Sequence, residues 1–378
     1  MLIRVIAAVL AFGFAAAVQG QIRLGFHAPL TGPTAADGKS SEVAANIAVD
    51  WINAAGGLLG QKVELIVYDD QGKADQSIPL ASKMIGQDKV AVAISGGYSL
   101  PTRAAAPVFQ KAGIPYFAAY AVHPDVTTGG NWAFRGVTLG PPQGAATAKF
   151  VADEFGKKRV SMITMDNDFG QSIADGFKES APKFGLTLLK EYTYSLRERQ
   201  FGSIIAAVKA DNPDVIVASG YFFVAGPLVS QLRAAGLTQP IVGSQAFDSM
   251  QFISIAKDSA EGVYVVGAMG RDRKHPDMDK FKAEFAKRAG HEIETVGANC
   301  YSAIMLVADA IKRAGSTDPK RVRDALAATK DFPMLTGTLR HFGASGEMYM
   351  PMEVSVVKSG SYRSYKIIDD PKLLDPAK

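Results

Sequence analysis

The sequence contains a single cysteine, Cys300, among its 378 residues, so no internal disulfide can form. Cys300 lies in an apolar stretch with helical spacing, 296–310, and we interpret it as a small buried hydrophobic residue rather than a nucleophile. A chain of this length, 47% apolar, can bury enough surface to fold without disulfides. Its length also predicts two domains of ordinary size.

A strong charge of either sign is also missing. Lysine and arginine together number 41 and the acidic residues 37, which gives a formal net charge of +4. The basic residues are spread along the chain without a basic run. This distribution argues against a dedicated nucleic-acid surface, and we predict no nucleic-acid partner.

The motifs of phosphate, metal and nucleophile chemistry are absent. Neither G-x-x-x-x-G-K-[ST] nor G-x-S-x-G occurs, and the first predicted strand continues into Gly-Phe-His-Ala-Pro at 25–29 instead of a G-x-G-x-x-G turn. The five histidines form no i, i+4 pair, so metal-ligand spacing is missing. Asp69-Asp70 is interpreted as a turn cap rather than an acid/base pair. We therefore predict no catalytic residues, no cofactor and no metal.

Only the N-terminus carries a long apolar run. Residues 5–18 are rich in Ala and Phe, follow Arg4 and lead into small residues. This pattern is typical of a secretory signal peptide, and the run is too short to favour a membrane span. We predict a signal peptide over 1–20, cleaved near Gly20, and a periplasmic protein. Cleavage after Ala17 and a retained membrane anchor are the alternatives.

The rest of the chain alternates between strand-like and helix-like segments. Apolar strands such as 90–94 and 159–165 alternate with helical patterns such as 39–55 and 169–184. This order predicts an α/β fold in which helices cover both faces of parallel sheets. Two such series predict two Rossmann-like lobes with a ligand cleft between them that closes by hinge motion. Three late strands are expected to finish the two sheets, at 337–342, 352–357 and 362–368.

One strand leads into a turn that suits an anion. The apolar run 90–94 is followed by Ser95-Gly96-Gly97, and a helical pattern begins close to Ser99 and Pro101. A turn of this kind places free backbone N–H groups of a helix N-terminus beside a hydroxyl, which favours a carboxylate ligand. The alternative is an ordinary strand-to-helix turn capped by a serine.

Aromatic residues follow several predicted strands. Ligands of open parallel sheets bind beyond the carboxyl ends of the strands, so residues at these ends are candidates for a site. Six aromatic residues at such positions indicate an apolar, flat-walled pocket: Tyr98, Tyr120, Tyr221, Phe222, Phe223 and Phe247.

Seven short motifs in order resemble those of a known family. They are Ala28–Pro33, Ile52–Gly57 with Gly60, Tyr68–Asp70, Ala112–Pro115, Asp166–Gly170, Leu232–Leu237 and Glu261–Val263. With them the chain resembles periplasmic solute-binding proteins of the branched-chain-amino-acid (Leu/Ile/Val-binding) type, which have the type I periplasmic binding fold and serve ABC importers. The resemblance implies a monomer that works with permease subunits in the inner membrane. It also implies an N-terminal lobe of 21–139 and 269–348 and a C-terminal lobe of 140–268 and 349–378.

The resemblance also implies a carboxylate site in the first lobe. Ser99 matches the serine that holds the ligand carboxylate. Backbone groups of Tyr120, Ala121 and Val122 match the next strand end, where Val122 stands in place of a usual threonine. Asp37 stands where an aromatic contact is usual.

In the second lobe the resemblance implies contacts to a ligand ammonium. Asp166 and Tyr221 match two of the usual positions, whereas Gln245 replaces a usual glutamate. An amide binds an ammonium more weakly than a carboxylate does. We therefore favour a small carboxylate ligand without an obligatory ammonium, such as an aromatic acid of the benzoate or cinnamate type.

Two alternatives stay open. Asp166 or Asp37 could replace the lost glutamate, in which case the ligand is a branched-chain or other hydrophobic amino acid. The protein could instead be the ligand-sensing subunit of a membrane receptor. The complete set of predicted ligand-binding residues is Asp37, Tyr98, Ser99, Tyr120, Ala121, Val122, Asp166, Tyr221, Phe222, Gln245 and Phe247.

Overall fold

The computed structural model describes residues 20–156, 158–267 and 269–376. The predicted signal peptide therefore lies outside the described residues, apart from Gly20. Among the described residues, no helix is both long and apolar enough to cross a membrane.

The first half of the chain forms a five-stranded sheet in which all neighbouring strands are parallel. The spatial order is β2-β1-β3-β4-β5. Its strands are short apolar runs without strict alternation, as expected of strands covered on both faces. The elements of this region are β1 (Ile22–Ala28), α1 (Ala35–Ala54), β2 (Val63–Asp69), α2 (Ala74–Lys83), the π-helix Met84–Asp88, β3 (Val92–Ser95), α3 (Ser99–Ala112), β4 (Tyr116–Ala118) and β5 (Ala133–Arg135).

A second sheet has seven strands in the order β15-β14-β10-β9-β8-β6-β7. Strands β6 to β10 are parallel, whereas β14 and β15 return antiparallel at one edge. The elements are α4 (Gly140–Phe155), β6 (Arg159–Met165), α5 (Asp168–Ser180), β7 (Thr187–Tyr194), α6 (Gly202–Asp211), β8 (Val215–Ser219), α7 (Phe222–Ala234), β9 (Ile241–Gly243), α8 (Met250–Ala256), β10 (Tyr264–Val266), β14 (Met352–Lys358) and β15 (Ser361–Ile368).

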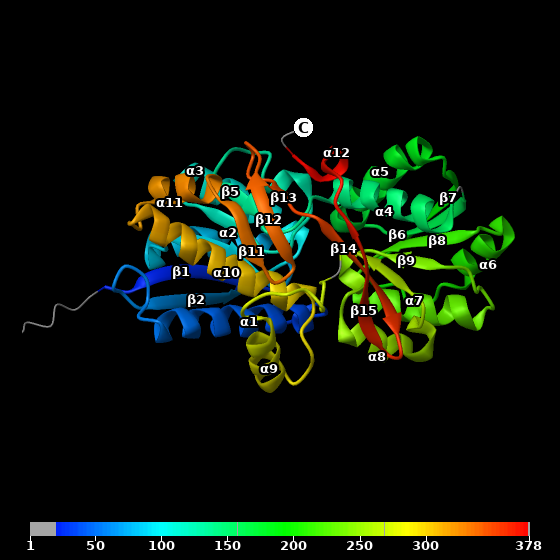
Figure 1. Cartoon of the computed structure of the whole chain (residues 1–378), viewed down its shortest axis with the longest axis horizontal. Coiled ribbons are helices and arrows are strands. Elements are labelled where there is room, and N and C mark those ends of the chain that lie inside the picture. Colours follow the sequence, from blue (N-terminus) through cyan, green and yellow to red (C-terminus); the bar gives the residue numbers. More distant parts are fainter. Residues whose placement is uncertain (1–19, 157, 268, 377–378) are drawn as a thin grey trace, which may run out of the picture.

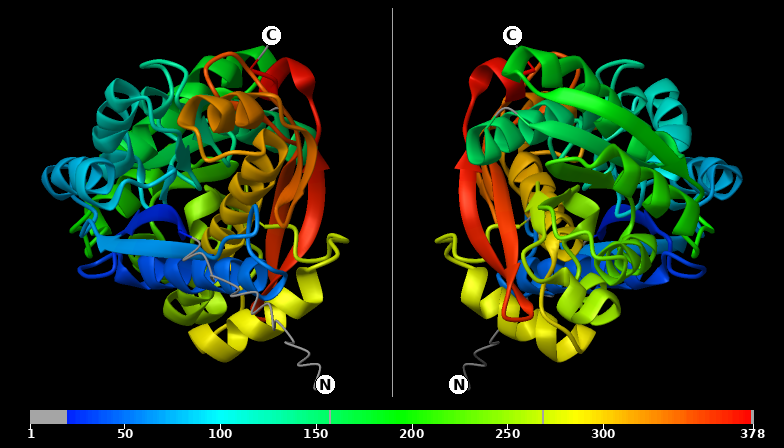
Figure 2. Two further views of the ribbon diagram at one scale, coloured as in Figure 1. Left: turned by 90° about the vertical axis from the view of Figure 1, so that its left-hand side faces the viewer. Right: turned by 90° about the vertical axis from the view of Figure 1, so that its right-hand side faces the viewer.

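The two sheets lie side by side along the long axis of the molecule, and the chain passes between them three times (Figure 1). The crossings lie between β5 and α4, between β10 and α9, and between β13 and β14. Helix α9 (Met278–Ala289) and helix α10 (Thr295–Ala314) both pack against α1 and so belong to the side of the five-stranded sheet. Helix α11 (Pro319–Ala327) packs against α10, and the short α12 (Pro371–Leu374) packs against α4 (Figure 2).

The prediction that 337–342 completes one of the two large sheets is wrong. This segment is β12 (Gly337–Phe342), which forms a separate three-stranded antiparallel sheet with β11 (Lys330–Met334) and β13 (Met348–Tyr349). A tight turn joins β11 to β12, so the nearest partner of β12 is its own sequence neighbour. The predictions for the other two late strands are confirmed, because β14 and β15 complete the seven-stranded sheet.

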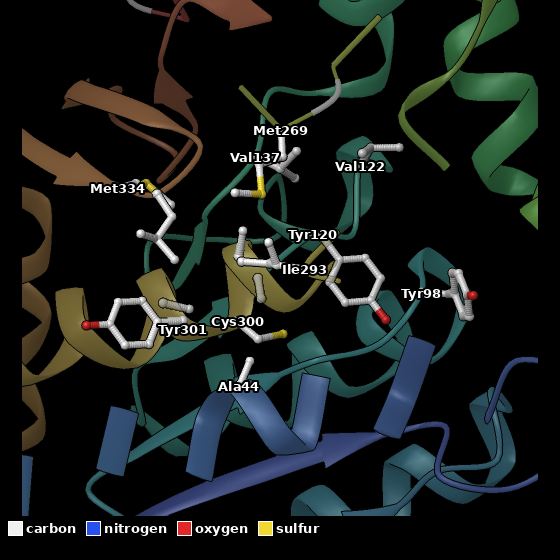
Figure 3. Packing of buried hydrophobic residues seen from close by; sticks show 14 of the residues in the cluster. Ala44, Tyr98, Tyr120, Val122, Val137, Met269, Ile293, Cys300, Tyr301 and Met334 are labelled. Carbon is white, nitrogen blue, oxygen red and sulfur yellow. The ribbon is translucent and has the colours of Figure 1, made fainter. Parts of the chain in front are cut away.

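A continuous core runs from one sheet to the other. It includes Tyr98 and Tyr120 on one side, together with Cys300 of α10 (Figure 3). Tyr221 belongs to it on the other side. The interpretation of Cys300 is confirmed, since the residue is fully buried and burial raises the pKa of its thiol to about 12. The side chains at the strand ends thus belong to the packing that joins the two halves.

Candidate functional site

A cavity lies where the carboxyl ends of both parallel sheets meet. It encloses about 430 Å³ not occupied by protein atoms, part of it open to solvent. Its walls come from the first turn of α1, the segments after β3, β4, β8 and β9, and the first turns of α5 and α10. The lining residues are Asp37, Tyr98, Ser99, Tyr120, Phe169, Tyr221, Gln245, Ala246, Asp248, Ser249, Thr295 and Val296.

The turn after β3 brings Ser99 to this cavity. Tyr98 occupies the N-cap position of α3, and Ser99 is the first helical residue. The Ser99 hydroxyl oxygen accepts a hydrogen bond of 3.3 Å from the backbone N–H of Val122. The first turn of α3 also leaves backbone N–H groups without helical partners. Two loops of the five-stranded sheet therefore present hydrogen-bond donors at one place, as a carboxylate requires.

A buried polar network fixes that turn from below. His27 bridges Asp70 and the Tyr116 hydroxyl, with 2.7 Å from Nδ1 to Asp70 and 2.7 Å from Nε2 to Tyr116. The Ser95 hydroxyl lies 2.7 Å from that of Thr102 at the start of α3. The network is buried and hydrogen-bonded throughout, which favours a rigid rather than an adaptable turn.

The close packing of the turn also requires glycine. A Cβ atom at Gly96 would lie only 2.2 Å from the ring of Phe26, so no larger residue fits there.

The interpretation of the nearby acidic pair, Asp69 and Asp70, is confirmed. Asp69 accepts a hydrogen bond from the N–H of Gln71, and Asp70 accepts one from the N–H of Gly72, so both carboxylates cap the turn that follows β2.

Four aromatic side chains form the walls of the cavity. Tyr98 and Tyr221 come from different sheets, and their ring centroids lie 4.3 Å apart. Phe169 of α5 packs 5.2 Å from Tyr221, and Tyr120 stands edge-on to Tyr98 at 5.9 Å. Burial raises the pKa of all three tyrosines above the ordinary value, so their hydroxyls stay neutral.

The other predicted aromatic residues do not line the cavity. Phe222 is the first residue of helix α7 and packs against Phe223. Phe247 is fully buried beneath the site, with its ring 5.1 Å from that of Phe252. The periodicity of the sequence located the strand ends but not the direction of these rings.

Three further predicted residues lie beside the cavity rather than on its wall. The backbone oxygen of Ala121 accepts a hydrogen bond from Arg135, and the side chain of Val122 is buried. Asp166 is exposed. Its neighbour Asn167 takes the N-cap position of α5, accepting a hydrogen bond from the N–H of Gly170.

Gln245 bridges the two halves at the base of the cavity. Its side-chain nitrogen lies 3.3 Å from the backbone oxygen of Tyr120, and its side-chain oxygen accepts a hydrogen bond of 3.0 Å from Gln143. Both ends of the amide are therefore engaged by the protein. A glutamate at this position would lose the bond to the Tyr120 carbonyl, which needs a donor.

Two carboxylates line the cavity in different environments. Asp248 is bound by Arg271 at 2.6 Å, by the backbone N–H of Met269 at 2.7 Å and by the hydroxyl of Thr295. Asp37 accepts one side-chain hydrogen bond, from the hydroxyl of Tyr98 to Oδ2 at 2.5 Å. Burial raises the pKa of Asp37 to about 6, although the Tyr98 bond acts in the opposite direction.

Sequence reasoning missed several of the residues that line the cavity. Asp248 and Ser249 follow β9 just beyond the predicted Gln245 and Phe247, and Thr295 and Val296 begin α10, where no strand-end rule applies. Phe169 lies within the Asp166–Gly170 motif directly after β6, so its position could have identified it as a lining residue.

Ion pairs also connect the two sides around the cavity. At the rim, Arg103 of α3 lies 2.9 Å from Asp168 of α5 and 3.3 Å from Asp125.

A third acid, Glu294, is buried behind Asp248, and burial raises its pKa to about 8. Within the part of the chain that the structure describes, no group of three or more His, Cys, Asp or Glu residues could hold a metal ion.

Comparisons with known proteins agree with this geometry. A family model described as "Periplasmic binding protein" matches residues 21–361. A Leu/Ile/Val-binding protein homologue from Brucella melitensis is 29% identical over 343 residues, covering 90% of this chain and 92% of the relative.

Two solved structures give the same picture at the level of the fold. A branched-chain amino acid transporter substrate-binding protein from Streptococcus pneumoniae, in complex with isoleucine, superposes with a TM-score of 0.85 at 27% identity. It covers 93% of this chain and 100% of that one. A solute-binding protein from R. palustris, in complex with benzoate, superposes with a TM-score of 0.83 at 21% identity, covering 93% and 98%. The second likeness shows the fold alone.

Proposed function

The chain belongs to the periplasmic binding protein family, and from this premise we propose that it captures a small carboxylic acid in its central cavity and delivers it to a membrane permease. The protein is a substrate-binding component of an ABC transporter and not an enzyme. We further propose that it is exported by the signal peptide over 1–20 and acts as a monomer. The two lobes with the boundaries given above would close around the ligand by hinge motion.

The arrangement of Ser99 and Val122 is the observation that carries this proposal. The Ser99 hydroxyl lies on the cavity wall at the N-terminus of α3, and the backbone N–H of Val122 donates to it from beside the cavity. These groups are neutral donors, and the positive end of a helix favours an anion. A bound carboxylate would accept a hydrogen bond from the Ser99 hydroxyl, whose oxygen now accepts the N–H of Val122.

The aromatic walls favour an aromatic acid as the ligand. Phe169 and Tyr221 from one half and Tyr98 and Tyr120 from the other surround the space beside Ser99. Flat rings pack well against such walls in stacked or edge-on geometry. This supports the benzoate or cinnamate class predicted from the sequence.

A hydrophobic amino acid is the second candidate. The carboxylate of Asp37 at the cavity favours it, because an ammonium would be attracted to this group. The name of the Brucella relative and the isoleucine bound by the Streptococcus protein point in the same direction. Asp166 is exposed beside the cavity and is a weaker candidate for the same role.

A thermal-shift screen of amino acids and aromatic acids tests the proposal. A ligand at a hundred times its dissociation constant adds about 2.7 kcal/mol to the free energy of unfolding, which raises the melting temperature measurably. We expect benzoates or cinnamates to give the larger shift. Shifts with leucine or valine alone would select the second candidate, and no shift with any acid would contradict both.

Replacement of Ser99 tests the carboxylate site itself. Ser99→Ala removes one hydrogen-bond donor from a charged acceptor, so we expect the affinity for the acid to fall by roughly 1–3 kcal/mol in calorimetry. Ser203→Ala on the exposed face of α6 is the matched control and should bind like the wild type. Equal affinities for the two variants would remove Ser99 from the site.

A further inference from the structure

The charge around the cavity is unbalanced. Of its twelve lining residues, which all belong to the described part of the chain, two are carboxylates and none is lysine, arginine or histidine. Asp248 is compensated by Arg271 and two further donors. Asp37 is buried at 6% exposure and has no cation within hydrogen-bonding distance among the described residues. A buried carboxylate without a cation is costly for the folded protein.

The geometry of Asp37 leaves one oxygen for a further partner. Its Oδ2 accepts the hydroxyl of Tyr98, whereas no hydrogen bond to Oδ1 occurs within the described residues. Tyr98 precedes Ser99 in the chain, so the same turn supplies the hydroxyl on Asp37 and the hydroxyl of the carboxylate site. Burial raises the pKa of Asp37 to about 6, in agreement with a missing positive partner.

Hydrogen bonds place the two subsites side by side. Asp37 lies in the first turn of α1, and its Oδ2 accepts the hydroxyl of Tyr98 at 2.5 Å. Tyr98 directly precedes Ser99, whose hydroxyl accepts the backbone N–H of Val122. A small acid whose carboxylate sits near Ser99 can therefore extend along the strand ends toward Asp37.

We propose that Asp37 is a specificity-determining residue whose free oxygen accepts a hydrogen bond from a second polar group of the ligand, an ammonium or a hydroxyl. The proposal rests on the carboxylate-binding function proposed above. Asp37 then selects acids that carry a donor and rejects simple anions, because an anion without a donor meets an uncompensated negative charge. Tyr98 is a positioning residue that holds the carboxylate of Asp37 toward the cavity.

Matched pairs of acids that differ only in the donor test this inference. The pairs are benzoate with 4-hydroxybenzoate and 4-methylpentanoate with leucine, each measured by calorimetry at pH 7.5. A hydrogen bond to a charged group predicts that the donor-bearing member of at least one pair binds the wild type roughly tenfold or more tightly than its partner. Asp37→Asn should reduce this preference to about threefold or less, chiefly by weakening the donor-bearing member.

Asp75→Asn is the matched control, since Asp75 is an exposed acid in the first turn of α2. It should keep the wild-type preference. If Asp37→Asn does not fold, Asp37→Glu replaces it, because moving the carboxylate by one methylene must also change the preference. Binding of acids with equal affinity within both pairs, or an unchanged preference in the Asp37 variant, overturns the inference while leaving the carboxylate site intact. Absence of binding by any acid instead contradicts the proposed function.

Discussion

The two carboxylates of the cavity show how burial can serve two different purposes. Asp248 on the hinge side has a full set of donors, with Arg271, Thr295 and the backbone of Met269 around it. On the side of the five-stranded sheet, the Asp37 carboxylate accepts a side-chain hydrogen bond only from the hydroxyl of Tyr98 among the residues that the structure describes. A buried carboxylate with a full set of hydrogen-bond donors stabilises the local structure. A buried carboxylate that lacks such partners can gain them from a bound ligand. The difference assigns a structural role to Asp248 and a ligand-binding role to Asp37.

Removal of the cation that pairs with Asp248 should have the largest effect on stability. Arg271→Met removes the cation from Asp248 and leaves a buried charge, so we expect the free energy of unfolding to fall by about 3–5 kcal/mol. Urea denaturation at neutral pH measures this loss. Arg363→Met, at an exposed position on β15, is the control and should stay close to the wild type. A loss below about 1 kcal/mol for Arg271→Met would show that Asp248 does not depend on its partner.

Buried acids with raised pKa values, such as Asp37, should make the stability of the protein depend on pH. Burial raises the pKa of Asp37 from 3.8 to about 6 and that of Glu294 from 4.5 to about 8. In the unfolded chain both acids ionise at lower pH, so the folded state loses stability as pH rises from the unfolded pKa values to those of the fold. We therefore expect the ligand-free protein to be more stable at pH 5 than at pH 8. A pKa that differs by one between the folded and the unfolded chain corresponds to about 1.4 kcal/mol.

Two variants assign this pH dependence. Glu294→Gln should flatten the profile between pH 4.5 and about 8, and Asp37→Asn between pH 3.8 and about 6, since each window runs from the pKa in the unfolded chain to the pKa in the fold. Stability that rises from pH 5 to pH 8 in the wild type would contradict the assignment.

Asp37 also interacts electrostatically with titratable groups of the elements packed against it. They are Tyr98, Tyr120, Tyr221, Glu294 and Cys300.

The exposed ion pair at the rim should have the smallest effect. Arg103 and Asp168 join α3 to α5 across the mouth of the cavity, with side chains that are 35% and 14% exposed. Arg103→Ala should disfavour the closed form by about 0–1 kcal/mol at low salt and by less at high salt. Small-angle X-ray scattering without ligand would show a slightly larger radius of gyration. Arg340→Ala, which breaks an exposed pair on one side only, is the control and should leave the radius unchanged.

The sequence was sufficient for most of the architecture because the parallel strands are short, buried apolar runs. Strand β3 and the helix after it follow directly from this pattern, and so does the position of Ser99 at the cavity. The three-residue strand β5 went unpredicted, since its residues Ala133–Arg135 are not a continuous apolar run. The partner of β12 was also mistaken, because a hydrophobic pattern does not specify which sheet a strand joins.

Within the site, local rules located residues directly after strand ends but not those farther along the loops or at the start of α10. Asp37, Tyr98 and Gln245 were predicted and line the cavity, whereas Asp248 and Thr295 were missed. Helix capping determines which of several residues after a strand points into the protein. Asn167 caps α5, and its predicted neighbour Asp166 is exposed. Side-chain direction in such turns depends on hydrogen bonds that form only in the folded chain.

The antiparallel edge of the seven-stranded sheet has a consequence for the order of folding. Strands β14 and β15 come from residues 352–368, although their sheet neighbour β10 ends at Val266. Until the last part of the chain is available, the edge of β10 stays open, and open edges invite association between chains. A chain truncated before β14 should therefore aggregate rather than yield a working half. Completion by the final residues suits a polypeptide predicted to cross a membrane before it folds.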